Sequence, residues 1–270
     1  MTSLASRLET ARSLLFVPGD RPVRFPKAVA SGADAVILDL EDAVAAPDKD
    51  TARTHVDAWL GEGNSAVVRI NAPNTRWYDD DLAMAVRHGV PVMVPKSEDP
   101  EVLADLACRT AGKCALLPLV ETAAGIERAG DVCRTPGVVR MALGNVDLAG
   151  QLGVAHDDHL ALAYSRSRLV SASAARGLAA PLDGVTTHVK DLEVLRADIA
   201  HARRLGFTGK LCIHPLQVAP VAEHFAPTEE ERRWANSVLA AGDGVSVVDG
   251  HMIDKPVLDR ARRILAAAGG

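Results

Sequence analysis

Eight short apolar runs in the first 215 residues most constrain the fold of this 270-residue chain. Longer stretches with helical character separate them, such as residues 49–61, 99–112 and 160–178. Alternating strand and helix patterns predict a parallel sheet, and strands that are apolar on both faces suit a sheet covered by helices. Eight such units predict an α/β fold, the TIM (β/α)8 barrel. The runs occupy residues 13–19, 35–42, 66–72, 91–97, 114–122, 138–147, 182–188 and 210–215.

A doubly wound sheet is the alternative fold. No G-x-G-x-x-G sequence follows the first apolar run, which weakens a dinucleotide-binding interpretation. Pro118, inside the fifth run, argues against a regular central strand, because proline has no N–H to donate. A bulge or another irregularity at this position would reconcile Pro118 with the barrel.

The 55 residues that follow the eighth run exceed what one closing helix of a barrel needs. Residues 227–242 and 255–269 have helical patterns, and residues 244–256 between them predict a short extended or hairpin segment. We therefore expect a barrel core over residues 1–215. Residues 216–270 are expected to form the closing helix and a short C-terminal helical extension, or lid.

The composition excludes several classes of protein. The formal net charge is −5 and aromatic residues make up 3%, so the chain lacks the basic excess and the stacking surfaces typical of nucleic-acid binding. Its four cysteines are scattered without a C-x-x-C pair, which is typical of reduced thiols in a cytosolic protein. The N-terminus has no apolar segment of signal-peptide length, and no run approaches the roughly 18 apolar residues of a membrane span. We expect a cytoplasmic protein with no nucleic-acid or membrane partner.

Most of the apolar runs end in residues that can do chemistry. In a parallel barrel all of these ends lie on one rim, where the active sites of such barrels are found. A single charge at such a position can mark the start of a loop, but the same polarity at the ends of several strands indicates a site. The residues are Asp39, Glu41 and Asp42 after the second run, Arg69 and Asn71 after the third, Lys96 after the fourth, Glu121 after the fifth, Asn145 and Asp147 after the sixth, and His214 after the eighth.

Arg69 stands among apolar residues in the third run. A guanidinium keeps its charge, so a buried arginine needs an anionic partner. Glu41 and Glu121 could supply this partner if they face the same barrel mouth. Two interpretations stay open: a structural ion pair, or an anion site in which Arg69 holds a substrate carboxylate or carbonyl.

Glu121 and Asp147 follow two adjacent strands of the predicted barrel. Neighbouring parallel strands lie about 5 Å apart, so the two side chains can converge on one ion. Two carboxylates with open remaining positions suit Mg²⁺, which keeps waters and takes substrate oxygens as ligands. The acidic cluster at residues 39–42 could orient those waters. Arg69 and a metal ion would then balance the negative charge of this cluster.

Six segments appear in the following order: RSLLFVPGDRPVRFPKAVASGADAVILDLEDAV, VVRINAPNT, VMVPKSED, LLPLVETAAGI, LGFTGKLCIHPLQV and DGHMIDKPVLDRA. This ordered set, which covers nearly the whole chain, resembles the citrate lyase beta-subunit-like family. That family belongs to the HpcH/HpaI aldolase superfamily, together with malyl-CoA and citramalyl-CoA lyases. The resemblance implies a TIM barrel, often a homotrimer, that needs Mg²⁺ as cofactor and makes or breaks a carbon–carbon bond between a 2-oxo acid and an acyl thioester.

The resemblance also implies roles for individual residues. Glu121 of the VETA segment and Asp147 of the GNVD segment become the metal ligands, and Arg69 of the VRIN segment becomes a substrate contact. Asp254 of the MIDKP segment corresponds to an aspartate that reaches a neighbouring subunit's site in relatives. The chain departs from the family at Val146, because relatives commonly read G-A-E-D where this chain reads GNVD. The departure affects substrate identity more than metal binding.

A Mg²⁺-dependent lyase of this kind would cleave a 3-hydroxy-3-carboxy acyl-CoA, such as citramalyl-CoA, malyl-CoA or citryl-CoA, into a 2-oxo acid and acetyl-CoA, or run the reverse reaction. Arg69 would stabilise oxyanion charge and Asp254 would transfer a proton at the enolate carbon. Asp254 also suits a helix N-cap before Pro256. The candidate catalytic residues are Arg69, Asp254, Glu41 and Asp42.

The candidate substrate-binding residues are Arg69, Glu121, Lys96, and the basic residues Arg21, Arg24 and Lys27 of the PGDRPVRFPK segment. The last three could bind the phosphates of CoA or form an ordinary exposed basic loop. His214 is expected to be structural. Two other functions stay open: an aldolase that acts on free hydroxy-oxo acids with the same metal chemistry, and a subunit that needs an acyl-carrier partner.

Overall fold

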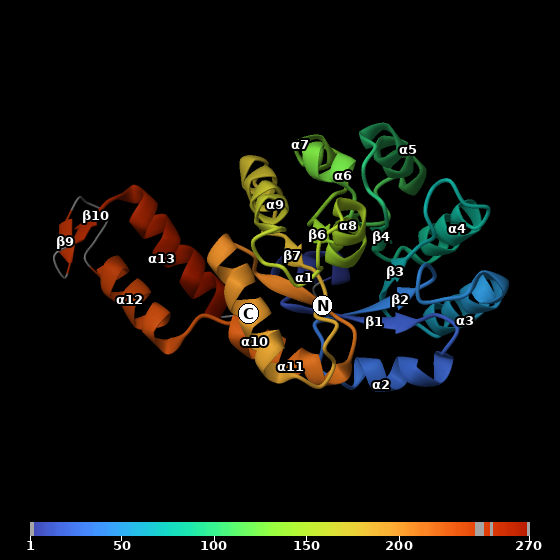
Figure 1. Ribbon diagram of the computed structural model, residues 1–270, viewed down its shortest axis with the longest axis horizontal. Helices are drawn as coiled ribbons and strands as arrows, with labels where there is room; N and C mark the ends of the chain where they lie inside the picture. The colour runs from blue at the N-terminus through green and yellow to red at the C-terminus, as the bar shows by residue number, and fades with distance from the viewer. Residues whose placement is uncertain (1–2, 241–245, 249–250, 269–270) are drawn as a thin grey trace. The chain divides into compact units, whose positions relative to one another are not determined.

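The computed structural model describes residues 3–240, 246–248 and 251–268. The chain divides into two compact units, Met1–Ala222 (unit 1) and Glu223–Gly270 (unit 2), which Figure 1 colours from blue to orange and from orange to red. Unit 1 contains a closed eight-stranded barrel, and unit 2 contains two helices and a two-stranded sheet. The TIM barrel prediction is therefore confirmed, and the doubly wound alternative is wrong.

All eight strands of the barrel are parallel to their neighbours and follow one another in chain order, and β1 pairs with β8 to close the ring. Seven strands fall inside one of the eight predicted apolar runs each, and β8 begins one residue before the eighth run. The strands are β1 (Ser13–Pro18), β2 (Ala35–Asp39), β3 (Val67–Arg69), β4 (Val92–Val94), β5 (Leu116–Val120), β6 (Ala142–Leu143), β7 (Leu182–Asp183) and β8 (Gly209–Cys212).

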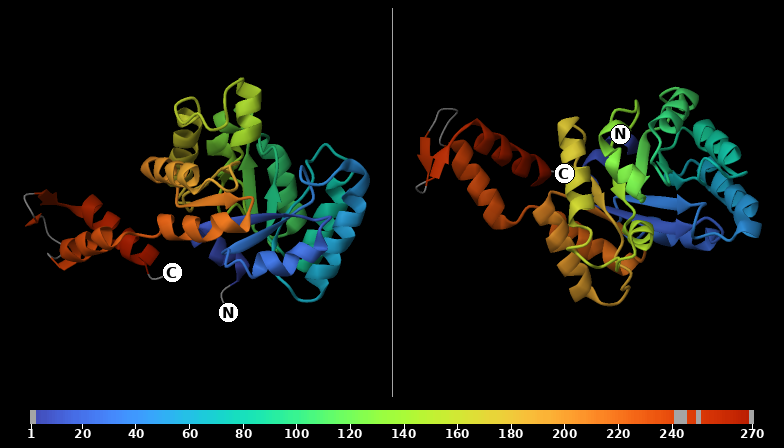
Figure 2. Two further views of the ribbon diagram at one scale, coloured as in Figure 1. Left: turned by 60° about the horizontal axis from the view of Figure 1, so that its bottom comes forward. Right: turned by 45° about the horizontal axis from the view of Figure 1, so that its top comes forward.

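Helices surround the strands of unit 1, as two further views show (Figure 2). Local sequence fixes several of their ends: Asp99 caps the first turn of α5, and Gly206, in a left-handed conformation, ends α10. The helices are α1 (Leu4–Thr10), α2 (Phe25–Val29), α3 (Lys49–Gly61), α4 (Tyr78–His88), α5 (Pro100–Thr110), α6 (Ala123–Glu127), α7 (Ala129–Val132), α8 (Asn145–Leu152), α9 (Ala163–Ala175), α10 (Leu192–Leu205) and α11 (Val218–Phe225), with short 3₁₀ turns η1 (Pro22–Arg24), η2 (Ala46–Asp48) and η3 (Pro215–Gln217).

The barrel interior is filled by aliphatic side chains from every strand, and α1 adds Leu8 to the same buried cluster. Helix α1 was not predicted from the sequence. It precedes β1, so it packs at the amino-terminal ends of the strands and leaves the opposite rim for chemistry. The barrel members of the cluster are Leu14, Ala35, Ile37, Val67, Met93, Leu117, Leu119, Ala142, Leu182 and Leu211.

Pro118 lies inside β5, and the sixth strand is irregular opposite it. Leu116 pairs with Val138 through an isolated bridge, and Leu119 pairs with Ala142. Residues 116–119 of β5 therefore lie opposite residues 138–142 of the sixth strand. The sixth strand has one extra residue here, which is a β-bulge. The irregularity that the barrel required at Pro118 is confirmed, because the extra residue interrupts the ladder on the side where proline has no N–H to donate.

A buried ion triad joins the outer face of the barrel to its helices. Asp183 of β7 pairs with Lys210 of β8 at 3.0 Å and with Arg166 of α9 at 2.9 Å. These two strand residues alternate with Leu182 and Leu211, which face the interior, so the triad lies between strands and helices. Burial works against the charge of Asp183, but the two cations lower its pKa overall.

Arg140 in the bulge connects the barrel to α1. Its fully buried guanidinium donates hydrogen bonds to the carbonyls of Leu8, Ala11 and Ala180 and to the hydroxyl of Thr208. The bulge thus turns a charged side chain toward carbonyl groups that the end of α1 leaves without helical partners.

Replacing Arg140 with Met should lower the free energy of unfolding by about 3–5 kcal/mol, because it leaves several buried acceptors without donors. The control is Arg134→Met, which removes an exposed arginine paired with Asp131 and should change stability by less than about 0.5 kcal/mol. Urea denaturation measures both variants. An equal, small loss in the two variants would contradict the role of Arg140.

Unit 2 contains α12 (Glu229–Ala240), α13 (Lys255–Ala268) and the antiparallel strands β9 (Ser246–Val248) and β10 (His251–Ile253). The predicted pair of helices is confirmed, and so is the extended segment over residues 246–248 and 251–253; residues 241–245 and 249–250 lie outside the described residues. Ala235 and Val238 of α12 pack with Ile253, Leu258 and Ala261 in a small core of its own. The predicted boundary at residue 215 stays a prediction.

Within the described residues, no helix is long and apolar enough to span a membrane.

Candidate active site

The carboxyl ends of the barrel strands surround a cavity of about 280 Å³. Polar and apolar residues both line it. The polar group contains Asp39, Asp42, Arg69, Glu121, Asn145 and Asp147, and the apolar group contains Phe16, Pro18, Ala43, Leu119, Leu143, Gly144, Val146, Val185, Leu211 and Ile213. The cavity therefore contains six of the residues that the sequence placed at this rim, together with a large apolar surface.

Arg69 at the end of β3 is held by an acidic residue of the neighbouring strand. Its Nε and Nη2 donate to the two carboxylate oxygens of Asp39 at 2.7 and 2.5 Å, and its Nη1 lies 3.0 Å from Glu41. Burial opposes the charge of Arg69, but these acids raise its pKa further. Glu41 is confirmed as a partner. The charge of Glu121 also raises the pKa of Arg69. Asp39 was not singled out as a partner, and it takes two donors because β2 and β3 are adjacent and bring it directly beside Arg69.

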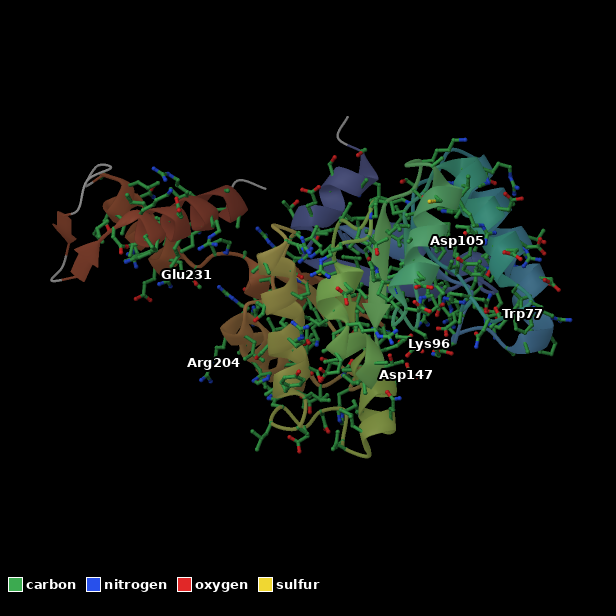
Figure 3. The ribbon with its side chains drawn as sticks, turned by 90° about the horizontal axis from the view of Figure 1, so that it is seen from above. Trp77, Lys96, Asp105, Asp147, Arg204 and Glu231 are labelled. Carbon is green, nitrogen blue, oxygen red and sulfur yellow. The ribbon has the colours of Figure 1, made fainter. Side chains whose placement is uncertain are left out.

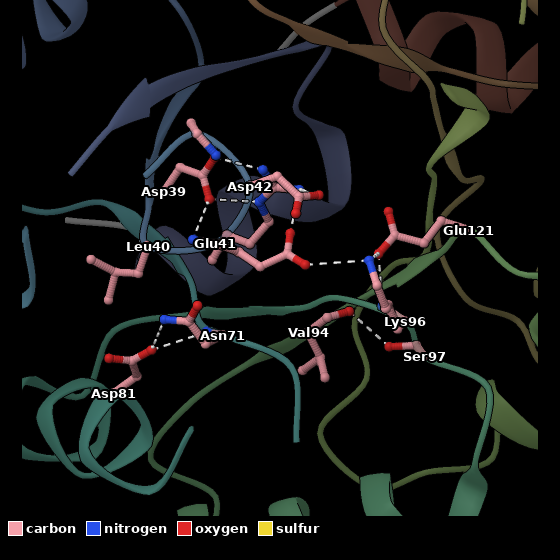
Figure 4. A network of polar contacts seen from close by, with 12 residues as sticks. Asp39, Leu40, Glu41, Asp42, Asn71, Asp81, Val94, Lys96, Ser97 and Glu121 are labelled. Atoms are coloured by element: carbon pink, nitrogen blue, oxygen red, sulfur yellow. Dashed lines mark hydrogen bonds and ion pairs between the residues drawn. The ribbon is translucent and has the colours of Figure 1, made fainter. Parts of the chain in front are cut away.

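Asp39 also shapes the loop that follows β2. Its carboxylate accepts hydrogen bonds from the backbone N–H groups of Glu41 and Ala43 (Figure 4). From the other side, the ammonium of Lys49 donates to the carbonyls of Leu40 and Glu41. Lys49 was missed in the sequence, where it looks like an ordinary helix-start lysine. Arg69 and Lys49 both hold the loop after β2. Their positive charges explain why this apolar run can end in clustered acids.

Glu41 connects Arg69 to Lys96. Its Oε1 lies 3.3 Å from the ammonium of Lys96, and this ammonium lies 3.7 Å from Glu121 Oε1 (Figure 4). Burial raises the pKa of Glu41, an effect that the charges of Arg69 and Lys96 oppose. Asp42 is different, because its side chain is 57% exposed and lies 4.0 Å from Arg69.

Glu121 ends β5 and is almost completely buried. Its Oε1 accepts the backbone N–H of Lys96 at 2.8 Å. Its Cβ and Oε2 lie so close to Gly144 that a Cβ on residue 144 would come within 2.4 and 2.5 Å of them, so only glycine fits there. Burial raises the pKa of Glu121 to about 8, although Lys96 lowers it. This carboxylate therefore lacks enough positive charge to offset its burial.

Asp147 lies in the first turn of α8, after the short strand β6. Its side chain is exposed, and its charge acts on both Glu121 and Lys96. Figure 3 shows Lys96 and Asp147 at the same end of the barrel.

Asn145 begins the same helix and is buried. Its amide nitrogen donates to the carbonyls of His156 and Val185, whereas its Oδ1 has no donor among the described residues. The sequence marked this position but assigned no role to it.

The oxygen atoms at this rim fit a magnesium ion. Glu121 and Asp147 are hard oxygen ligands from adjacent strands, and Glu121 is buried without sufficient positive charge nearby. Within the described residues, no group of three or more His, Cys, Asp or Glu side chains is arranged to hold a metal. Mg²⁺ is commonly bound by two protein carboxylates, with water and substrate oxygens as the remaining ligands. A structural zinc site instead has four protein ligands.

The basic side chains after β1 are exposed on the connection to α2. Arg21 lies 3.4 Å from Asp20, and Arg24 and Lys27 are also exposed. They follow a strand end on the same rim as the cavity but do not line it.

The histidines that follow the strands have local structural contacts. His214 accepts the backbone N–H of Leu216 at the start of η3, as its expected structural role requires. His156 contacts Thr187, and His159 contacts Asp198 and stacks on His201.

Asp254 lies in unit 2, immediately before α13. Its carboxylate accepts the backbone N–H of Val257 at 3.3 Å, and its carbonyl accepts that of Leu258. The residue therefore caps this helix, which was one of the two interpretations of the MIDKP segment. Its proposed action at an active site stays a prediction.

Comparisons with known proteins found a family, relatives and solved structures similar to this chain. Residues 12–215 match the HpcH/HpaI aldolase/citrate lyase family. A citrate lyase subunit beta-like protein of Deinococcus radiodurans is 36% identical over 94% of this chain and 96% of its own length. A (3S)-malyl-CoA thioesterase of Cereibacter sphaeroides is 34% identical, with 98% and 97% covered. The crystal structure of CitE from Mycobacterium tuberculosis in complex with magnesium, acetoacetate and coenzyme A superimposes with a TM-score of 0.83 at 35% identity, covering 97% of this chain and all of that one.

Proposed function

This chain belongs to the HpcH/HpaI aldolase/citrate lyase family and is a lyase, and we propose that it cleaves the carbon–carbon bond of a 3-hydroxy-3-carboxy acyl-CoA with Mg²⁺ as cofactor. The products are a 2-oxo acid and acetyl-CoA, and the reverse reaction forms the same bond. The observation that carries the proposal is the convergence of two carboxylates, Glu121 and Asp147, with the fixed guanidinium of Arg69 in one cavity.

Glu121 and Asp147 would hold the ion. When bound, Mg²⁺ makes the substrate hydroxyl more acidic and neutralises the oxygen of the forming carbonyl. Arg69 is fixed from behind by Asp39 and lines the cavity, so it can stabilise negative charge on a substrate oxygen without moving.

The substrate hydroxyl must lose a proton before the carbon–carbon bond breaks, and the released enolate must gain one. Both oxygens of Glu41 already pair with cations, whereas Asp42 lines the cavity at 4.0 Å from Arg69 and is more exposed. Asp42 is therefore the better candidate to accept the hydroxyl proton, and Glu41 the residue that orients Arg69 and Lys96.

The exposed residues Arg21, Arg24 and Lys27 would bind the phosphates of CoA. They lie on the connection after β1, at the rim that the cavity occupies, and guanidinium groups suit phosphate oxygens.

Asp254 would supply the proton to the enolate from a neighbouring subunit. In this proposal the enzyme is a cytoplasmic homotrimer, and unit 2 of one subunit closes the cavity of another. Such a lid would exclude water from the enolate.

The apolar part of the cavity supports a preference among substrates. Val146, Val185 and Ile213 lie at the rim, and Leu143 lies deeper. A hydrogen or a methyl group at the substrate C3 would suit these apolar contacts. The additional carboxylate of citryl-CoA would lose its hydration there without gaining a hydrogen-bond or ion-pair partner. Malyl-CoA and citramalyl-CoA are therefore the preferred substrates.

The purified chain assayed alone with Mg²⁺ tests this proposal. Acetyl-CoA should form from malyl-CoA or citramalyl-CoA, at a kcat/KM at least about tenfold above that for citryl-CoA. EDTA should abolish turnover, and the free acids malate and citramalate should not react. Cleavage of free acids at a comparable rate would favour the aldolase alternative. Activity only with substrate attached to an acyl-carrier protein would favour the subunit alternative, and free CoA together with intact malate would indicate thioester hydrolysis instead.

A further inference from the structure

Lys96 holds a position that is unusual for a flexible surface lysine. It follows β4, and its ammonium lies 3.3 Å from Glu41 and 3.7 Å from Glu121. Burial works against its charge, but Glu121, Glu41, Asp42 and Asp147 together raise its pKa. The ammonium therefore lies among the acids of the site, although the side chain is 43% exposed.

The backbone of Lys96 fixes this placement. Its φ angle is +49°, a left-handed conformation that only one other described non-glycine residue, Ala111, adopts. Ala111 ends helix α5, where that conformation is common, whereas Lys96 lies in the turn that follows β4. The N–H of Lys96 donates to Glu121 Oε1 at 2.8 Å, so the same carboxylate holds the backbone and attracts the ammonium. Strained backbone of this kind concentrates at functional sites.

The ammonium and a metal ion would compete for Glu121. A magnesium ion lies about 2.0–2.1 Å from its carboxylate ligands, inside the distance at which the ammonium already lies. Two cations beside one buried carboxylate repel each other, although water screens part of this repulsion because the Lys96 side chain is 43% exposed. Glu121 has one ion pair with a described residue, and Lys96 makes it. The ammonium therefore offsets part of the negative charge to which the metal would bind.

We propose that Lys96 is an internal counterion that occupies the magnesium site in the metal-free protein and is displaced from Glu121 when the metal binds. The proposal rests on the proposed function in one respect, the assignment of Glu121 as a metal ligand. In the metal-free protein Lys96 stabilises the acidic rim, and the cost of displacing it weakens the affinity for Mg²⁺. Lys96 is a positioning residue in this scheme, because it acts through Glu121.

The test compares Lys96→Met with the parent chain. Methionine has a similar length and no charge, and it meets the same left-handed backbone cost as lysine, so the substitution isolates the ammonium. Lys113→Met is the matched control, because Lys113 is an exposed lysine on the loop after α5. Calorimetric titration measures the dissociation constant for Mg²⁺, and thermal unfolding with and without Mg²⁺ measures stability.

We expect opposite effects in the two measurements. Without metal, Lys96→Met should melt at least about 3 °C below the parent, because the acids lose their counterion. Its affinity for Mg²⁺ should be at least about fivefold higher, because no cation must be displaced. The rise of the melting temperature on adding Mg²⁺ should therefore exceed that of the parent. Lys96→Arg should keep the parental pattern, and Lys113→Met should change nothing.

Weaker Mg²⁺ binding in Lys96→Met, or unchanged affinity and unchanged melting temperature, would overturn the proposal. If Lys96→Met does not fold, Lys96→Gln undergoes the same titration with the same expected direction. Glu121→Gln separates the two hypotheses. If the parent binds Mg²⁺ and Glu121→Gln binds it equally well, the proposed metal site is wrong. If Glu121→Gln loses the metal while Lys96→Met behaves like the parent, only the counterion role is wrong.

Discussion

Glu121→Gln should abolish measurable Mg²⁺ binding and lower kcat by at least about 100-fold, the largest effect we expect from a single isosteric change. Glutamine has the shape of glutamate, so it still fits against Gly144 and can accept the N–H of Lys96. Only the charge is lost. Because that charge is buried, its loss removes a ligand that water replaces poorly at this position.

Asp147→Asn should weaken Mg²⁺ binding in the same assay, although less strongly, because Asp147 is exposed and water can take its place. The control is Asp105→Asn on α5, a carboxylate that is 66% exposed and pairs with Arg109. Calorimetric titration and kcat measured over a range of Mg²⁺ concentrations separate binding from chemistry. Parental Mg²⁺ dependence in both Glu121→Gln and Asp147→Asn would show that the ion is held elsewhere.

The barrel and the rim that carries the candidate site could be predicted, because both follow from the order of the strands along the chain. Each apolar run becomes one strand, and parallel strands in sequence order place every carboxyl end on the same rim. Glu121 and Asp147 therefore converge for a reason that depends on topology alone. The bulge opposite Pro118 could be anticipated for a similar reason, since proline has no N–H for the ladder.

Contacts that depend on side-chain direction could not be predicted. Asp39 and Glu41 lie two residues apart at the end of the same run. Only the register of β2 against β3 decides that Asp39 takes Nε and Nη2 of Arg69 and leaves Nη1 to Glu41. Lys49 and Arg140 bond to backbone carbonyls, which leave no mark in the sequence. The sequence also cannot distinguish the two interpretations of Asp254, which are a helix cap and a residue that acts in the site of a neighbouring subunit.

Asp254→Asn should lower activity by at least about 100-fold while leaving Mg²⁺ binding and stability intact, if this residue protonates the enolate. Asparagine caps helices as well as aspartate does, so α13 keeps its N-terminal hydrogen bond and only the acid is lost. Asp259→Asn is the control, because Asp259 lies in the same helix and pairs with Arg262 on its surface. Equal activity losses in the two variants would point to a defect of the helix rather than of catalysis.

Mixing two inactive variants then decides which subunit supplies Asp254. Glu121→Gln is a better partner than a truncation of Arg69, because removing Arg69 would leave Asp39 buried without its cation. If the sites are shared, a site is intact where a chain with Glu121 meets a neighbour with Asp254. Random exchange of equal amounts makes about a quarter of the sites intact, so about a quarter of the parental activity should return. If Asp254 acts within its own chain, every site lacks one group and none returns. Exchange must first be demonstrated with differently tagged chains, because without it both schemes predict an inactive mixture. A recovered quarter of the activity would therefore establish that the lid crosses between subunits.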